Sequence, residues 1–287
     1  MLKLLSRHLL RIAVTMLLGG LIAATLVRFA PGFDSDQQLM DSRLSAESIQ
    51  AIVQQRAAQH NVLKFYVGFL SSAVRGDFGQ SQTLDRPVRE LIGERLPVTL
   101  KLMGYGLLVG WSLALLFAVT ATMARIAAWD LATTALAGLF LCIPSAVLAL
   151  AFVFIQAPGF LALGLIVFSN VFRYWRNLLD KSYAMPHIIT ARAKGVGTLR
   201  ILLWHVLPVS GAQLLAVAGV SVSIALGAAI PVEALCGIPG IGQLAWQAAL
   251  GRDLSLLVTL TLLVTVVTLA ANTASDLLGQ AFRTQRA

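Results

Sequence analysis

Apolar residues along the chain gather into six long blocks separated by short polar or charged segments. A block of about 20 apolar residues is long enough to cross the hydrocarbon core of a bilayer as an α-helix. We therefore predict an all-α membrane protein with six transmembrane helices, the third and fourth joined by a tight turn at Ala157-Pro158-Gly159. The blocks cover about Leu9–Ala30, Val98–Met123, Leu131–Phe154, Phe160–Tyr174, Val209–Pro231 and Leu254–Leu278.

The composition agrees with this pattern. Of the 287 residues, 57% are hydrophobic and 12% are charged, whereas a soluble domain carries about 25% charged residues. These values exclude a soluble enzyme, a disordered chain and a nucleic-acid-binding protein. Lys3, Arg7 and Arg11 are followed by the apolar stretch of the first block, as in a signal peptide, but no clear cleavage site follows it, so we interpret the block as an uncleaved helix.

The distribution of charge predicts the orientation in the membrane. The net charge is +9. If the N-terminus is cytoplasmic, the inner segments hold twelve basic and three acidic residues, and the rest of the chain is neutral. Basic residues are enriched in cytoplasmic loops. We therefore expect both termini in the cytoplasm, with no acidic partner needed to explain the charge.

The long segment between the first two blocks, residues 31–97, then lies outside the cytoplasm. Its pattern predicts a small helical segment. We divide the chain into three parts, which are the first transmembrane helix (residues 1–30), this segment (31–97) and a five-helix core (98–287). Three short helices are expected in the segment, from Ser45 to Asn61, from Leu63 to Arg75 with a stop at Gly76, and from Pro87 to before Pro97.

Residues that carry chemistry are sparse in the predicted spans. No carboxylate or histidine lies near the middle of a span, as a proton-driven carrier requires, and no protease constellation or P-loop occurs. We predict no catalytic residue and no metal site, and we expect any energy source to be another subunit. The ionisable residues at span ends, interpreted as reaching to the interface, are Arg28, Lys101, Asp130 and Asp276.

Small residues recur in the second and fifth spans. They are Gly106 and Gly110 in the second, and Ser221, Ser223 and Gly227 in the fifth. Small residues allow close approach of helix backbones. Two interpretations remain open: ordinary helix packing, or helices that line a translocation path.

The loop 181–208 is the most informative hydrophilic segment. Pro186 can open a helix that stops at Gly195, and Thr198 can cap a second helix that Pro208 interrupts. Ala191 and Ala193 give the first helix a smooth surface that suits the cleft of a partner. A merely basic interfacial loop is the alternative.

Several sequence motifs resemble those of one family. The stretch TARAKG at Thr190–Gly195, followed by WHVLP at Trp204–Pro208, is similar to the EAA loop of ABC importer permeases. Specifically, it resembles the first-subunit (B-type) branch of the dipeptide/oligopeptide/nickel family. Further matches are RFAPG at Arg28–Gly32, RGDFGQS at Arg75–Ser81, RPVRELIGERLPVTLKL at Arg86–Leu102, IPS at Ile143–Ser145, and EALCGIPGIGQLAWQAALGRD at Glu233–Asp253.

The resemblance implies two functional surfaces. One is a coupling helix that docks on an ATPase subunit, formed by His187, Ile188, Ile189, Thr190, Ala191, Arg192, Ala193, Lys194 and Gly195. The other is an outer gate and binding-protein face, formed by Gly76, Asp77, Phe78, Gly79, Glu233, Pro239 and Gly240. Ile189 occupies a position that is usually acidic in the family, and the link between spans three and four is shorter than usual.

The resemblance also implies a function. It predicts a permease subunit of the bacterial cytoplasmic (inner) membrane, not an enzyme, that forms half of a translocation path. Its cargo would most often be di- or oligopeptides, with nickel, a metal chelate or another small solute as alternatives. Expected partners are a second homologous permease, two ABC ATPases that use ATP and magnesium, an extracytoplasmic substrate-binding protein and membrane lipid, but no nucleic acid. A secondary carrier that works without ATP is the rival from another class.

Overall fold

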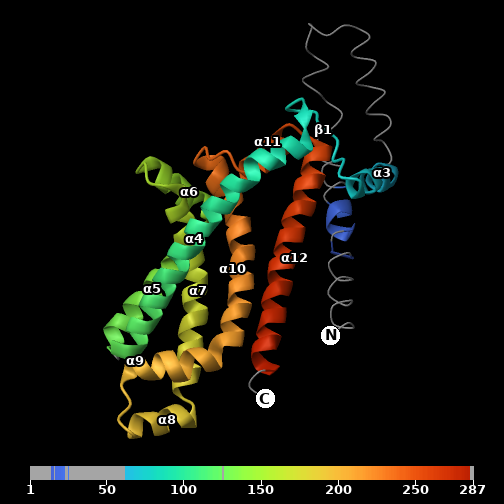
Figure 1. The fold of residues 1–287 in the computed structure, drawn as a ribbon. Helices are drawn as coiled ribbons and strands as arrows, with labels where there is room; N and C mark the ends of the chain where they lie inside the picture. The colour runs from blue at the N-terminus through green and yellow to red at the C-terminus, as the bar shows by residue number, and fades with distance from the viewer. Residues whose placement is uncertain (1–13, 16, 23–24, 26–61, 125, 285–287) are drawn as a thin grey trace, which may run out of the picture. The chain divides into compact units, whose positions relative to one another are not determined.

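The computed structural model describes residues 14–15, 17–22, 25, 62–124 and 126–284, and these residues are mostly α-helical. One two-stranded antiparallel hairpin pairs Gln80 with Pro87 and Ser81 with Arg86. In chain order the elements from residue 62 are α3 (Val62–Val74), β1 (Gln80–Ser81), β2 (Arg86–Pro87), α4 (Val88–Ala124), α5 (Ala127–Cys142), α6 (Ser145–Phe154), α7 (Gly159–Tyr183), α8 (Pro186–Ala193), α9 (Thr198–Ile201), the π-helix η1 (Leu202–Val206), α10 (Leu207–Leu235), α11 (Ile241–Leu250) and α12 (Leu254–Thr284) (Figure 1).

The chain divides into two compact units. The first joins the described residues up to Leu96 with Leu244–Val267. Its core is an apolar cluster in which Tyr66 and Phe69 of α3 pack with Val258 and Leu262 of α12. The Tyr66 hydroxyl also donates a hydrogen bond to the Leu17 carbonyl at 2.9 Å, so this unit ties the N-terminal helix to α3.

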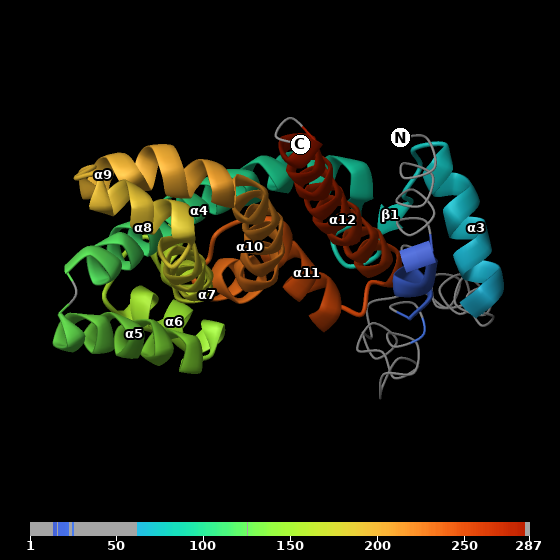
Figure 2. The ribbon, with the colours of Figure 1, turned by 90° about the horizontal axis from the view of Figure 1, so that it is seen from below.

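The second unit, Pro97–Gln243 with the residues from Thr268 onward, is built around α7. Thirteen of the 25 residues of α7 are buried, because α5, α6 and α10 pack against it. Figures 1 and 2 show α8 and α9 at one end of α7 and α10, with α9 running crosswise to α10; α6 lies at the other end. The loop singled out from the sequence therefore lies at one end of this unit.

Among the described residues, three helices are long and apolar enough to cross a bilayer. They are Val88–Ala124, Thr198–Leu235 and Leu254–Ala281, and α5 with α6 would make a fourth if the bent pair counts as one span. The predicted span Phe160–Tyr174 lies in α7, whose charged residues begin at Arg173. This helix is not among the three that are long and apolar enough to cross a bilayer.

Two predicted helix boundaries differ from the structure because of proline. The helix expected to end before Pro97 continues through it to Ala124. One missing N–H costs a single hydrogen bond, and Gly93, whose carbonyl loses it, is exposed. The predicted third span is instead broken into α5 and α6, bent by 97°, because Pro144 forces the preceding Ile143 into an extended conformation.

Other predictions are confirmed or lie outside the described residues. The helix expected at Leu63–Arg75 forms as α3, and Gly76 follows it with φ +80°. The tight link before α7 is present, with Pro158 as the N-cap of that helix. The predicted helix Ser45–Asn61 and most of the span Leu9–Ala30 lie outside the described residues.

Candidate functional site

The helix predicted in the loop 181–208 forms as α8. Met185 is extended and Pro186 occupies the first turn, where its fixed φ suits the helix and its missing N–H has no intrahelical role. At the other end Gly195 adopts φ +74°, and the Val196 amide donates to the Ala191 carbonyl at 3.1 Å. The predicted start and stop are thus confirmed, with the left-handed glycine typical of a helix C-terminus.

The faces of α8 are unequal. Ile188 is 0% exposed and Ala191 is 7% exposed, so both side chains pack against their own chain. On the opposite face Ile189 is 58% exposed, and Thr190 and Ala193 are also exposed. Of the predicted docking residues, Ile188 and Ala191 therefore face inward, whereas His187, Ile189, Thr190, Arg192, Ala193, Lys194 and Gly195 are at least partly exposed.

Polar contacts attach α8 to the bundle. The Arg192 guanidinium lies 4.9 Å from the centroid of the Tyr183 ring, at the end of α7. Burial raises the pKa of the Tyr183 hydroxyl, and the nearby Arg192 charge opposes that shift. One residue earlier, the hydroxyls of Ser182 and Ser210 are 3.0 Å apart and join α7 to α10. The end of α7 thus contacts both neighbouring elements.

The second helix of the loop begins at Thr198 as predicted, but Pro208 does not interrupt it. Instead, the helical segment Thr198–Leu235 continues through Pro208 without a break, although it bends so that α9 runs crosswise to α10 (Figure 1). The π-helix at Leu202–Val206 lies just before the proline. Pro208 cannot donate the usual hydrogen bond to Trp204, and a π-turn accommodates that missing partner without breaking the helix.

On the first unit, two predicted motifs meet. Asp253, which is fully buried, accepts hydrogen bonds from the Ser81 hydroxyl at 2.6 Å and the Thr83 amide at 3.2 Å. Its other oxygen accepts from the Leu256 amide at 3.0 Å and so caps the first turn of α12. The hairpin β1–β2 is therefore attached to the start of α12 through one carboxylate.

The predicted outer-face residues of this unit lie beside that hairpin. Gly76 and Gly79 both have positive φ, and the Asp77 carboxylate accepts the Gly79 amide at 2.9 Å. An open hollow of about 310 Å³ is lined by Gly68, Phe69, Ser72, Asp77, Phe78, Gly79 and Ser255.

An exposed ion pair stands next to the same hairpin. Both terminal nitrogens of Arg86 bond Glu94, at 3.0 and 2.6 Å. These hydrogen bonds raise the pKa of the Arg86 guanidinium. Since both side chains are about half exposed, the pair contributes little to stability.

In the second unit, Glu233 holds the start of α11. Its buried carboxylate accepts the amide of Gly242 at 2.6 Å and that of Gln243 at 3.3 Å, and Thr99 accepts the Ile241 amide at 2.7 Å. A negative group at a helix N-terminus is favourable. Of the predicted outer-face residues in this unit, Glu233 and Gly240 are buried and Pro239 is exposed.

Most of the predicted path residues pack against other helices of the chain. A Cβ on Gly106 would lie 2.7 Å from Leu163, and one on Gly110 would lie 2.7 Å from Val167, both on α7. The Ser221 hydroxyl accepts the Trp111 indole N–H at 3.0 Å, and Ser223 accepts from Asn272 at 3.3 Å. Gly227 alone among these five is exposed, and a Cβ added there would have no atom within 4 Å. The packing interpretation accounts for the other four.

No metal-binding group occurs in the part of the chain that the structure describes, where no three His, Cys, Asp or Glu side chains converge. Cys142 and Cys236 are both free thiols.

Comparison with known proteins identifies the family. The family described as "Binding-protein-dependent transport system inner membrane component" matches residues 106–285, which is more than half of the chain. The chain belongs to this family. It is thus a membrane-spanning permease subunit of an ABC transporter and not an enzyme, and the ATPase activity of such transporters lies in separate subunits.

Relatives with a stated cargo cover nearly the whole permease. The oligopeptide transport system permease protein OppB of Escherichia coli (strain K12) is 28% identical over 286 residues, 92% of each chain. OppB of Haemophilus influenzae is 27% identical over 304 residues, 97% of each chain. Among solved structures, the inward-facing MetNI methionine ABC transporter has a TM-score of 0.56 at 20% identity, covering 68% of this chain and 94% of that chain. This last similarity shows a shared fold.

Proposed function

We propose that the permease forms half of the translocation path of an ATP-driven oligopeptide importer. Its partners would be a second homologous permease and two ABC ATPase subunits, which use ATP and magnesium. The observation that carries this proposal is the similarity to oligopeptide permeases over 92% of both chains. A match of this length is not limited to one shared motif.

The proposed docking surface for the ATPase is the exposed face of α8. Ile189 and Ala193 are four residues apart and therefore share one face of the helix, opposite the buried Ile188 and Ala191. An apolar, small-residue face of this kind can enter a cleft without leaving a charge unpaired. The basic residues Arg192 and Lys194 flank it.

The proposed outer face carries the β1–β2 hairpin and the turn before α11. Residues 31–97 and 233–253 would lie outside the cytoplasm, where a substrate-binding protein delivers cargo, and both termini would be cytoplasmic. The excess of basic residues in the opposite set of segments supports this orientation. The buried Asp253 and Glu233 hold backbone amides in these two segments, so each segment by itself has a defined backbone conformation.

Transport would follow from rigid-body motion rather than from side-chain chemistry. Closure of the ATPase dimer would displace α8, and the helices attached to α8 would move with it and switch the path between its outward- and inward-open forms. No residue of this chain would need to change its covalent state.

Uptake into proteoliposomes tests the proposed cargo. The vesicles would hold both permeases and the ATPases, with the binding protein and labelled trialanine or histidine-chelated nickel outside and ATP inside. We expect ATP-dependent uptake of the peptide, abolished when a non-hydrolysable analogue replaces ATP. Uptake of chelated nickel without peptide uptake would contradict the oligopeptide proposal, and uptake without ATP would contradict the importer proposal.

A further inference from the structure

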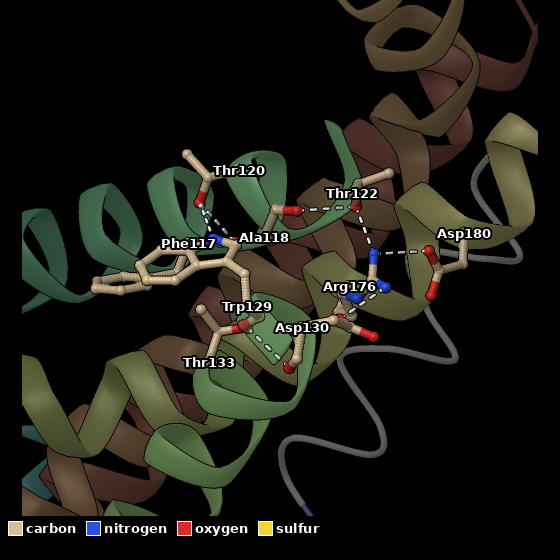
Figure 3. Close-up of polar contacts among 9 residues, drawn as sticks. All are labelled: Phe117, Ala118, Thr120, Thr122, Trp129, Asp130, Thr133, Arg176 and Asp180. Carbon is tan, nitrogen blue, oxygen red and sulfur yellow. Dashed lines mark hydrogen bonds and ion pairs between the residues drawn. The ribbon is translucent and has the colours of Figure 1, made fainter. Parts of the chain in front are cut away.

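An arginine joins three helices at the end of the second unit that carries α8. The Arg176 side chain, on α7, is 19% exposed. One terminal nitrogen donates to the Thr122 hydroxyl of α4 at 2.6 Å and to Asp180 at 2.8 Å; the other lies 2.8 Å from Asp130 of α5 (Figure 3). One guanidinium thus contacts α4, α5 and its own helix.

Neighbouring contacts hold the same corner of the bundle. The Thr122 hydroxyl donates onward to the Ala118 carbonyl at 2.8 Å. The Trp129 ring stacks on Phe117 with a centroid distance of 6.2 Å, and its indole N–H lies 3.3 Å from the Thr120 hydroxyl (Figure 3). These contacts attach the start of α5 to the end of α4, so Arg176 binds a corner that is already packed.

The same stretch of α7 leads directly to α8. Arg176 lies seven residues before Tyr183, whose ring contacts Arg192 of α8, and Ser182 contacts Ser210 of α10. The last two turns of α7 therefore contact α4, α5, α8 and α10. This stretch therefore links α8 to α4 and α5, while α9 contacts α8 on the side that leads to α10.

We propose that Arg176 is a positioning residue that clamps α4, α5 and α7 into one body, so that a displacement of α8 moves these helices together. This inference rests on the proposed function of α8 as the docking helix. The guanidinium contacts Thr122 and Asp180 through one terminal nitrogen and Asp130 through the other, and a lysine ammonium has no second nitrogen to keep all three contacts. In this role Arg176 keeps the three helices together while they move, and it makes no contact with the cargo.

Distance measurements between two spin labels test the clamp without knowledge of the cargo. Labels would be placed at the exposed positions Ala184 in the turn before α8 and Ala128 in α5 by Ala184→Cys and Ala128→Cys, with Cys142→Ser and Cys236→Ser to remove the native thiols. The complete transporter would be measured without nucleotide, and with ATP bound to hydrolysis-deficient ATPases.

We expect one narrow distance distribution in both nucleotide states of the otherwise native permease. In Arg176→Met the distribution should broaden and shift when ATP binds, and Arg176→Lys should restore the narrow distribution only in part. The matched control is Arg173→Met, which removes an exposed arginine three residues away on the same helix. If Arg176→Met fails to insert, the pair Asp130→Ala and Asp180→Ala removes both carboxylate contacts of Arg176 from partly exposed side chains.

The outcomes separate the clamp from the docking proposal. A narrow, unshifted distribution in Arg176→Met, or in the double alanine variant, would overturn the clamp. The distribution could instead broaden in the variant and stay the same with and without ATP. That result would support the clamp and contradict the docking of α8.

Discussion

The buried carboxylate of Asp253 accepts hydrogen bonds from one side-chain and two backbone donors. Because Ser81, Thr83 and Leu256 all donate to it, Asp253→Ala should leave buried donors unsatisfied and remove a helix cap. We expect a loss of about 1–3 kcal/mol in the free energy of unfolding. The measurement is the midpoint of unfolding by sodium dodecyl sulfate in mixed micelles.

Two variants serve as controls for Asp253. Asp253→Asn keeps a side-chain oxygen that can accept and should lose less, and Asp85→Asn changes an exposed carboxylate in the same hairpin and should change the midpoint little. An equal loss from Asp85→Asn would mean that the hairpin is sensitive to any change of charge, and the role assigned to Asp253 would be wrong.

Gly240 is a second position where a single added carbon atom is expected to change the structure. A Cβ there would overlap the Glu233 carboxyl group, which itself holds the amides at the start of α11. Gly240→Ala should therefore displace the carboxylate and expose the turn before α11, at a cost of about 1–3 kcal/mol. Limited proteolysis of the detergent-solubilised permease would show faster cleavage near that turn. Gly227→Ala, at an open position of α10, should leave the cleavage pattern unchanged.

At the scale of elements, the close approach of α4 and α7 depends on glycine. A Cβ at Gly110 would meet both Val167 and the Gly164 carbonyl at 2.7–2.8 Å, so Gly110→Leu should force the two helices apart and lower the thermal unfolding midpoint. Gly104→Leu, on the same helix where nothing lies within 4 Å, is the matched control. If both leucines were tolerated equally in thermal unfolding, the packing of α4 on α7 would be different from that described.

Prolines mark the limit of what the sequence predicts about these elements. Pro144 lies at the boundary where one helix ends, Pro97 lies inside another helix, and Pro208 lies just after a π-helix. The local chemistry is alike in the three cases, since each proline lacks an N–H. The outcome depends on how the neighbouring helices pack, which periodicity along one chain does not reveal.

The candidate site was predictable in part for a similar reason. The pair Pro186 and Gly195 specifies where α8 begins and ends, and both bounds are confirmed. The buried face could not be assigned, because Ala191 and Ala193 are the same residue type and only the rest of the fold distinguishes them. An aspartate just before the apolar run of α12 is a recognisable capping signal for Asp253, whereas nothing in the sequence pairs Arg176 with Asp130.

At the scale of the whole molecule, the charge distribution predicts the orientation. With twelve basic residues in the inner segments, a fluorescent protein fused after Ala287 should fold and fluoresce in the cytoplasm, and alkaline phosphatase fused there should be inactive. The opposite result, active phosphatase at this end, would reverse the assignment of inner and outer faces and with it the position of α8.

The docking of α8 is the central claim at this scale, and single-cysteine cross-linking to the ATPase tests it most directly. In a permease with Cys142→Ser and Cys236→Ser, we predict that Ile189→Cys and Ala193→Cys cross-link to the ATPase within the assembled transporter. Ala191→Cys should not, because that position faces its own chain. Cross-linking from Ala191 but not from Ile189 would contradict the assigned face, and no cross-link from any exposed position of α8 would contradict its role as the docking helix.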